Sequence, residues 1–334
     1  MMETSLSHRR IAVIAARLSS TLACASLFTA CGGGDDAAPA PGPAPSRVLT
    51  AATEPRLTSE SVQLLTRVSA AWADVTATAT QAHATARSKP GTLATLDALT
   101  RPQAIQESST DPCLFGGTQT LTFNYASKTD SKVGDYSSTA FADCRVDDRT
   151  ILNGLTKATL VALADTSETW DLAAADFATL TDDVLWRESG TSRVATDTLA
   201  APATGQKLSV TFDAYSFFHS KGGVQHADYT VSGTATADVN PAAQSYAATV
   251  TLKVTGDLKD VGTLSWTIET PTRLQGSTAA LAPTGGTVKL KLADGSTVTL
   301  TPGTTGVRVV VDFNGDGKAE VEVNRTWAQI AASL

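Results

Sequence analysis

An oxygen-rich stretch near the C-terminal end of the sequence carries the residue types best suited to chemistry. It runs from Asp312 to Glu320 and reads DFNGDGKAE. Oxygen-bearing side chains stand at positions 1, 3 and 5, a glycine at position 6 allows a sharp turn, and a carboxylate stands at position 9. Calcium takes oxygen ligands arranged in this way. The stretch therefore predicts a calcium-binding loop.

The same stretch resembles the loop of FG-GAP (integrin-type) repeats, which binds calcium. The resemblance implies a ligand set of four side chains with one carbonyl between them: Asp312, Asn314, Asp316 and Glu320, with the Lys318 carbonyl. Two features depart from known patterns. Val323 stands where an EF-hand has its glutamate, and the sequence has one copy where a propeller needs several. The alternative is a polar hairpin between residues 307–311 and 321–323, because Asn-Gly and Asp-Gly form turns unaided. Calcium is the one cofactor predicted, in a structural role with weak affinity.

Two histidines and a carboxylate form a second, weaker constellation. A hairpin with residues 220–223 as its loop would pair His219 with Val224 and leave His219, His226 and Asp228 on one sheet face. Such a group could hold zinc with an open coordination position, as a metal-dependent hydrolase requires. The spacing matches no specific motif, and solvated histidines on a strand are the simpler interpretation.

Signatures of known enzyme classes are otherwise missing from the sequence. It has no Gly-x-Ser-x-Gly elbow, His-Glu-x-x-His, phosphate loop or Cys-x-x-Cys. The adjacent carboxylates Asp147-Asp148 and Asp182-Asp183 would point to opposite faces of a strand, so we expect them to mark turns. The formal net charge of −7, without a cluster of Lys and Arg, argues against a nucleic-acid partner. The sequence thus predicts a protein that is not an enzyme.

The N-terminal residues have the pattern of an export signal. Arg9 and Arg10 precede the largely apolar residues 11–30. Residues 27–36, LFTACGGGDD, then resemble the lipobox of bacterial lipoproteins. The resemblance implies that residues 1–30 are a lipoprotein signal peptide and that Cys31 becomes lipidated. The alternatives are a retained membrane-spanning anchor or an ordinary signal cut near Ala30.

The lipobox resemblance also predicts where the protein resides. Gly32, rather than aspartate, follows Cys31. By the sorting rules of enterobacterial lipoproteins, this favours the outer membrane over the inner membrane. Residues 31–56 would form a lipidated tether rich in Pro, Ala and Gly, which favours the extended polyproline II conformation. The expected partner is therefore the membrane, reached through the Cys31 lipid anchor in the cell envelope.

The remaining cysteines agree with export. Cys24 would leave with the signal peptide and Cys31 would be lipidated, so Cys113 and Cys144 remain. In an oxidising compartment this pair most simply forms a disulfide. Closing a loop of this length would stabilise the fold by roughly 3–4 kcal/mol.

Periodicity divides the remainder into a helical segment, residues 57–103, and an antiparallel β domain, residues 104–334. Apolar residues at steps of three and four predict a helix over residues 57–88 with Thr58 as its cap, and a second helix over residues 92–101. Residues 326–334 predict a short closing helix. From Gly116 onward apolar and polar residues alternate, which indicates antiparallel strands with one wet face, including short strands around Trp170 and Trp186.

The fold class expected is therefore mainly β. It would be a large curled antiparallel meander, whether barrel, half-barrel or sandwich, with an N-terminal helical hairpin. Three motifs of the β domain resemble those of uncharacterised β-rich lipoproteins of Gram-negative bacteria: Cys113-x-x-Gly116-Gly117, Phe141-x-x-Cys144 and Leu152-Asn153-Gly154. This resemblance implies no known activity.

The function expected is that of a membrane-anchored cell-envelope lipoprotein with a non-enzymatic structural or interaction role. Its partner in the envelope would be a protein or a lipid. Two alternatives stay open. One is a periplasmic carrier or chaperone for lipid or another apolar ligand, by analogy with the curled sheet and helical lid of lipoprotein-sorting carriers. The other is the metal-dependent hydrolase that the histidine group would require.

Overall fold

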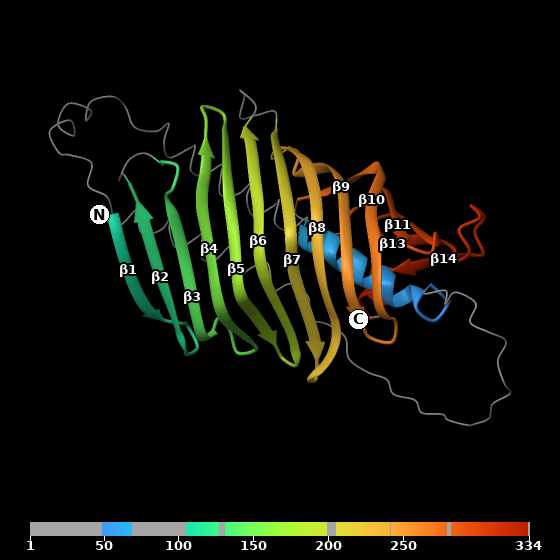
Figure 1. The fold of residues 1–334 in the computed structure, drawn as a ribbon, viewed down its shortest axis with the longest axis horizontal. Helices are drawn as coiled ribbons and strands as arrows, with labels where there is room; N and C mark the ends of the chain where they lie inside the picture. Colours follow the sequence, from blue (N-terminus) through green and yellow to red (C-terminus); the bar gives the residue numbers. More distant parts are fainter. Residues whose placement is uncertain are drawn as a thin grey trace.

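The computed structural model describes residues 49–68, 105–126, 131–198, 205–240, 242–278 and 282–332. Within these ranges, fourteen strands form one antiparallel sheet whose spatial order follows the sequence (Figure 1). The expected antiparallel meander is confirmed. The sheet does not close, because the described residues pair β1 only with β2 and β14 only with β13. The predicted helix over residues 92–101, and the predicted first helix beyond residue 68, lie outside the described residues.

The strands differ widely in length, and the longest lie in the middle of the sheet. Their bounds are β1 Ile105–Pro112, β2 Thr118–Tyr125, β3 Tyr136–Arg145, β4 Thr150–Leu163, β5 Ser167–Thr181, β6 Val184–Thr198, β7 Gln206–Lys221, β8 Val224–Asn240, β9 Ser245–Leu258, β10 Gly262–Ser277, β11 Gly285–Leu292, β12 Thr297–Pro302, β13 Gly306–Asp312 and β14 Val321–Thr326.

Alternating side chains give the sheet one buried inner face and one wet outer face. In β9, Val250, Leu252 and Val254 are buried, whereas the threonines between and beside them are exposed. Successive strand residues point to opposite faces, so this pattern fixes which face turns inward. The β-branched threonines suit a solvated strand face.

The prediction of short strands around Trp170 and Trp186 is wrong. Both residues belong to 15-residue strands, β5 and β6, joined by a turn at Asp182-Asp183. A bulge at Asp176 shifts the inward positions of β5 from even to odd residue numbers. This shift interrupts the two-residue period that identifies a strand in a sequence.

Three bulges of the same construction lie in alternate strands, β3, β5 and β7. Their central residues, Asp143, Asp176 and Ala214, have left-handed φ angles of 47°, 48° and 50°. Each N–H of these residues donates to a side-chain oxygen on the following strand, at 2.7, 3.0 and 3.1 Å respectively. The acceptors are Asn153, Ser189 and Ser232. The three hairpins therefore repeat one local design.

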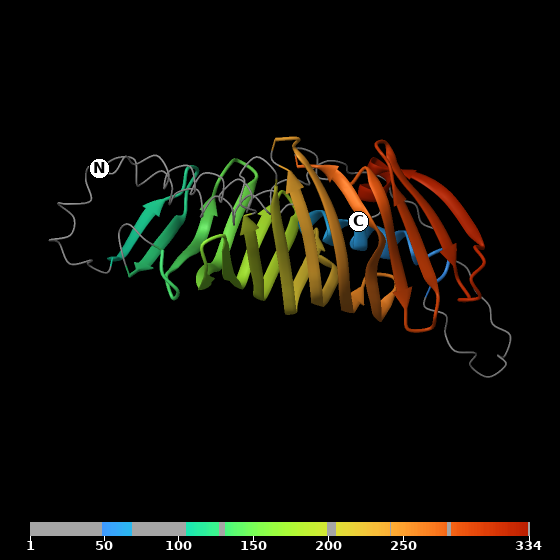
Figure 2. The same ribbon diagram turned by 90° about the horizontal axis from the view of Figure 1, so that it is seen from above.

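A glycine follows each acceptor, and it lets the strands approach closely. At Gly154, an added Cβ atom would lie 2.2 Å from the carbonyl oxygen of Asp176, so a larger residue does not fit. The pattern Leu152-Asn153-Gly154 thus has a physical basis in the bulges on either side of it. Bulges increase the local twist and bend a strand. Bulges in three alternate strands therefore add to the twist of the sheet, whose curl is visible in Figure 2.

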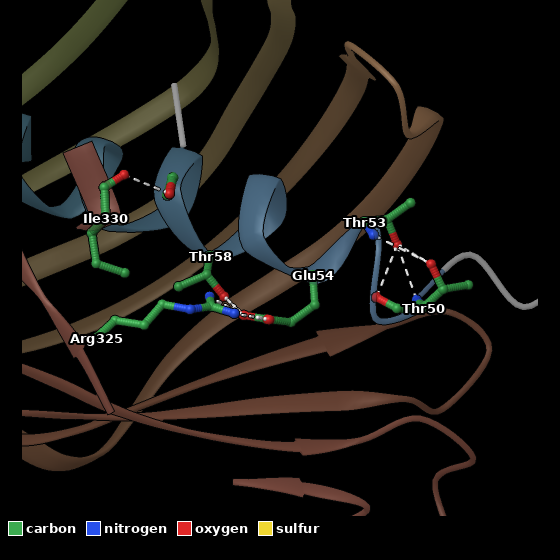
Figure 3. A network of polar contacts seen from close by, with 7 residues as sticks. Thr50, Thr53, Glu54, Thr58, Arg325 and Ile330 are labelled. Carbon is green, nitrogen blue, oxygen red and sulfur yellow. Dashed lines mark hydrogen bonds and ion pairs between the residues drawn. The ribbon is translucent and has the colours of Figure 1, made fainter. Parts of the chain in front are cut away.

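The N-terminal helix begins at residue 54 and is described to residue 68. The predicted cap at Thr58 is wrong, because Thr58 lies inside the helix and its hydroxyl donates to Glu54 Oε1 at 2.5 Å. Pro55 is tolerated because the first helical turn needs no N–H donors. Thr50 and Thr53 hydrogen-bond each other just before the helix begins (Figure 3).

The sheet curls around this N-terminal helix and encloses it. On one side, Trp266 of β10 donates its Nε1–H to Ser61 Oγ at 3.1 Å. On the other side, Ser59 Oγ donates to the carbonyl oxygen of Ile330 at 2.7 Å (Figure 3). Ile330 belongs to α4 (Trp327–Ala332), the short closing helix predicted from the sequence. Leu57 and Leu64 are 1% and 0% exposed, so the helix packs as part of the core.

The predicted disulfide joins Cys113 and Cys144 across a Cα–Cα distance of 5.4 Å. It ties the β1–β2 turn to the end of β3. Cys144 belongs to a small second core with Phe141, Leu152 and Phe177, separate from the main core that surrounds the helix.

Candidate metal centre and buried polar seam

The predicted calcium loop connects β13 to β14. Asp312 is the last residue of β13, and the Glu320 N–H closes the loop by donating to the Val311 carbonyl oxygen at 2.9 Å. One carboxylate oxygen from each of Asp312, Asp316 and Glu320 lies within 4.8 Å of the others. Among the described residues, this is the group of three or more acidic, histidine or cysteine side chains that could hold a metal ion.

Asp312 is held at the centre of the loop by backbone donors. Its Oδ1 accepts the N–H groups of Asn314 and Gly315 at 3.2 and 2.6 Å, and its Oδ2 accepts that of Gly317 at 2.8 Å. Burial by itself would raise the pKa of this carboxyl. The backbone N–H groups oppose that effect and lower the pKa below its usual value. Asp312 is therefore kept in the charged form that a cation requires.

The other predicted ligands are already bonded within the loop. Asn314 Oδ1 accepts the Asp316 N–H at 2.8 Å, and Asn314 Nδ2 donates to Glu320 Oε1 at 2.5 Å. The N–H of Lys318 donates to Asp316 Oδ1 at 2.8 Å. The structure thus brings three predicted carboxylates together, whereas the Asn314 amide makes hydrogen bonds within the loop. Any cation would have to compete with these internal hydrogen bonds.

The neighbouring β11–β12 turn supports the loop from outside. Gly315 has a φ of +74°, and a Cβ atom added there would lie 2.8 Å from the Gly295 carbonyl oxygen. The close contact requires glycine at this position. Two turns that are adjacent in the sheet therefore hold each other, and the carboxylates are positioned before any ion arrives.

The histidine group is not assembled as predicted. His219 pairs with Ala227, Lys221 pairs with Val224, and a register shift separates His219 from Ser220. The bulge arises because His226 is an extra residue on β8. Asp228 consequently lies on the exposed outer face, while His219 is 3% exposed on the inner face. The rings of His219 and His226 remain neighbours, with centroids 5.4 Å apart.

A different carboxylate, Glu60 of the N-terminal helix, lies beside His219. Glu60 Oε1 is 3.9 Å from His219 Nδ1 and 3.1 Å from Arg56 Nη2. Arg56 Nη2 also donates to the carbonyl oxygen of His226 at 3.0 Å. A guanidinium therefore supplies the positive charge beside this carboxylate. Zinc would have to displace Arg56, so the geometry does not favour a metal at this position.

These residues are one end of a buried polar seam between helix and sheet, composed of Arg56, Glu60, Arg67, Trp186, Glu188 and His219. Trp186 stacks on His219 at 4.0 Å between ring centroids, and the Arg67 guanidinium lies 3.9 Å from the Trp186 ring. Arg67 also pairs with Glu188 at 2.6 Å. Cation–π contact and ion pairing thus hold the same guanidinium.

Two buried tyrosines adjoin the seam. The Tyr215 hydroxyl donates to Glu188 Oε2 at 3.1 Å. Burial, with Glu188 adding to it, raises the pKa of Tyr215 well above its usual value. The pKa of Tyr229 is also raised, mainly by burial and further by Glu60. Unlike Tyr215, Tyr229 has no hydrogen-bond partner for its hydroxyl among the described residues.

The seam contains buried polar atoms without hydrogen-bond partners in the described part of the chain. They include both Glu60 carboxylate oxygens and His219 Nδ1. The ion pair to Arg56 therefore compensates Glu60 by charge but lacks hydrogen-bond geometry. The sequence offered one signal for this seam. Arg56, Glu60 and Arg67 recur at helical spacing, but such a row normally marks a solvated helix face.

The chain matches no protein-family model, no curated protein and no solved structure. Its helices, as far as the structure describes them, include none that is both long and apolar enough to cross a membrane. Cys31 and the predicted signal peptide lie outside the described residues, so lipidation stays a prediction.

Proposed function

We propose that this chain is a non-enzymatic lipoprotein of the cell envelope, held at the outer membrane by lipid on Cys31. The observation that carries the proposal is the enclosed N-terminal helix, which begins at residue 54 and takes in the last three residues of the predicted tether. Glu54, at its first position, makes two hydrogen bonds to Arg325 of β14, at 2.8 and 2.5 Å (Figure 3). A sheet that binds the C-terminal end of the predicted tether is suited to a fixed structural or interaction role.

The disulfide supports the same assignment. Structural disulfides persist in oxidising compartments such as the periplasm. The bond between Cys113 and Cys144 links segments that carry little core of their own. An exported protein gains stability from such a bond, whereas a cytosolic protein would lose it to reduction.

Membrane fractionation with mass spectrometry of the N-terminal peptide tests the anchor. We expect the native chain in the membrane fraction with a diacylglyceryl group on Cys31. Cys31→Ser should release the chain, whereas Cys24→Ser should leave it anchored. A chain that stays soluble with an unmodified Cys31 would refute the proposal.

Calcium binding by the β13–β14 loop is the second part of the proposal. Three preorganised carboxylates with one lowered pKa favour a hard cation, and extracellular modules bind calcium at about 10⁻⁴–10⁻³ M. Calorimetry should show saturable calcium heat in the millimolar range. Asp316→Asn should remove that heat, whereas Asp183→Asn, in the β5–β6 turn, should not. The absence of heat from the native chain would show that the loop is a polar hairpin only.

A carrier role is a second candidate, and Glu60 is the observation that favours it. A helix whose carboxylate is buried without a hydrogen bond from any described residue is easier to displace than one packed by apolar contacts alone. Leaving the sheet would expose the apolar inner face to a lipid. Lipid that copurifies with the native chain, and is lost when a cross-link fixes the helix to the sheet, would support this role over a purely structural one.

A further inference from the structure

The β1–β2 turn presents two large apolar side chains to solvent. Leu114 is 81% exposed and Phe115 is 54% exposed. We call this pair the apolar tip. Scattered exposed apolar residues are ordinary on protein surfaces. Two adjacent exposed apolar side chains on one turn are less ordinary, because together they form a continuous apolar surface.

The apolar tip is built to hold its shape. The Phe115 N–H donates to the Arg145 carbonyl oxygen at 3.1 Å, and the Arg145 N–H donates to the Gly116 carbonyl oxygen at 2.8 Å. The disulfide fixes Cys113, the residue before the tip. After it, Gly117 has a φ of +74°, and a Cβ atom there would lie 2.0 Å from the Asp143 carbonyl oxygen. The turn is therefore fixed on both sides, so its backbone holds Leu114 and Phe115 in solvent.

Arg145 adds a positive charge at the base of the apolar tip. Its side chain is exposed and makes no ion pair with another described residue. Its Cδ lies 3.9 Å from the position that a Cβ atom would take at Gly116. Two apolar side chains with an arginine beside them suit a phospholipid surface, which offers hydrocarbon to the apolar side chains and phosphate to the guanidinium.

The predicted anchor is within reach of the same surface. Arg56, in the first turn of the N-terminal helix, contacts His226 near the start of β8. The start of β8 and the end of β1 lie on the same edge of the antiparallel sheet. Seven strand spacings separate them, or about 35 Å. Residues 49–55 lie between Arg56 and the tether and add at most about 25 Å to that distance, and residues 32–48 can span up to about 60 Å. The lipid on Cys31 and the apolar tip can therefore occupy one leaflet.

We infer that the apolar tip inserts into the phospholipid leaflet that holds the Cys31 lipid, with Arg145 on a head-group phosphate. This inference rests on the proposed lipid anchor. Asp111 and Asp143 are exposed near the tip and disfavour strongly anionic surfaces, so the occupant is a zwitterionic phospholipid. Insertion would give the protein a second membrane contact and a fixed orientation.

Fluorescence quenching in the lipidated full chain tests the inference. Phe115→Trp places a reporter at the tip, and the chain is reconstituted in phosphatidylcholine vesicles with or without bromine on the acyl chains. We expect bromine to quench at least half of the emission that the introduced tryptophan adds to the parent chain. Leu163→Trp is the matched control, because Leu163 is 48% exposed at the opposite edge of the sheet. The emission that a tryptophan at position 163 adds should be the same in vesicles with and without bromine.

The possible outcomes separate the inference from the proposed function. An anchored chain whose added emission at position 115 is not quenched would overturn the inference and leave the lipid anchor intact. A chain absent from the vesicles would refute the anchor instead, and the inference with it. Leu114→Asp, introduced together with Phe115→Trp, should reduce quenching severalfold. Equal quenching with and without Leu114→Asp would show contact without insertion, which also contradicts the inference.

Discussion

The two ends of the sheet are stabilised in different ways. From β6 onward, the strands curl around the N-terminal helix and share one large buried core with it. From β1 to β5, the described residues contain a much smaller core, which consists of Phe141, Cys144, Leu152 and Phe177. The disulfide lies in this second region, β1 to β5, which we call the stapled region. We call the first region, from β6 onward, the helix-enclosing region. A covalent bond thus appears where the apolar core is small.

The comparison also shows where buried charge is tolerated. Glu54 and Glu60 are 3% and 0% exposed, and both belong to the helix that the large core surrounds. By contrast, the ion pair between Arg149 and Asp182, in the stapled region, is solvent-exposed. Burying a charge costs free energy that only extensive packing and a paired opposite charge can offset. The four predictions that follow test this contrast.

The largest effect is expected at Glu54. Glu54→Gln would leave the Arg325 guanidinium, 17% exposed, without its carboxylate. Removing one partner of a buried pair typically costs 3–5 kcal/mol, so we expect a loss of roughly 4 kcal/mol in the free energy of unfolding. Urea denaturation followed by circular dichroism would measure it.

Glu322 provides the matched control, because it lies on β14, the strand that also carries Arg325. Its pair with Arg308 is about half exposed on both sides. Glu322→Gln should therefore change stability much less than Glu54→Gln does, because solvent screens an exposed pair. If the two substitutions had equal effects, burial would not be the source of the difference between the pairs.

The next largest effect is expected in the stapled region. Replacing both Cys113 and Cys144 by serine opens a loop with a sequence separation of 31. The chain-entropy model gives a loss of roughly 3–4 kcal/mol. Because the large core does not include these residues, the loss should be local. Hydrogen exchange should accelerate in β1, β2 and β3 and stay slow in β8 and β9. Uniform acceleration across all strands would show that the two regions unfold as one unit.

A smaller effect is expected at Tyr215. Tyr215→Phe removes a hydrogen bond to the Glu188 carboxylate inside the helix-enclosing region. Hydrogen bonds to charged groups are worth about 1.5–3 kcal/mol, and Arg67 still compensates Glu188. We expect a loss of about 2 kcal/mol by thermal or urea denaturation. No loss would mean that Arg67 alone satisfies this carboxylate.

The same contrast explains which features could be predicted from the sequence. The β13–β14 loop is contiguous in sequence, so the approach of its three carboxylates could be predicted from their spacing, whereas calcium binding there stays a prediction. Strands β9, β11, β12 and β13 keep a regular two-residue period, as Leu252 and Val254 of β9 illustrate. The short strands predicted around Trp170 were wrong because a bulge at Asp176 shifts that period within one strand.

The buried polar seam could not be predicted, for a related reason. Glu60 approaches His219 only because the sheet curls around the helix, and no local pattern encodes that curl. A glutamate on a helix is normally solvated, so the apolar stripe was taken as the one buried face. The predicted zinc group failed at Asp228 because His226 is an extra residue on its strand.

The smallest effect is expected at Tyr229, and its sign differs from that at Tyr215. The Tyr229 hydroxyl is buried without a hydrogen-bond partner among the described residues, so Tyr229→Phe removes a desolvation cost. At neutral pH we expect no loss of stability, or a gain of up to about 1 kcal/mol.

The raised pKa of Tyr229 means that folding favours the neutral phenol. That contribution is complete below the unfolded pKa of about 10 and is lost as pH rises above it. Tyr229→Phe should therefore flatten the alkaline loss of stability, measured by urea denaturation between about pH 8 and 11. A loss of stability at neutral pH in the variant would show instead that the hydroxyl is hydrogen-bonded.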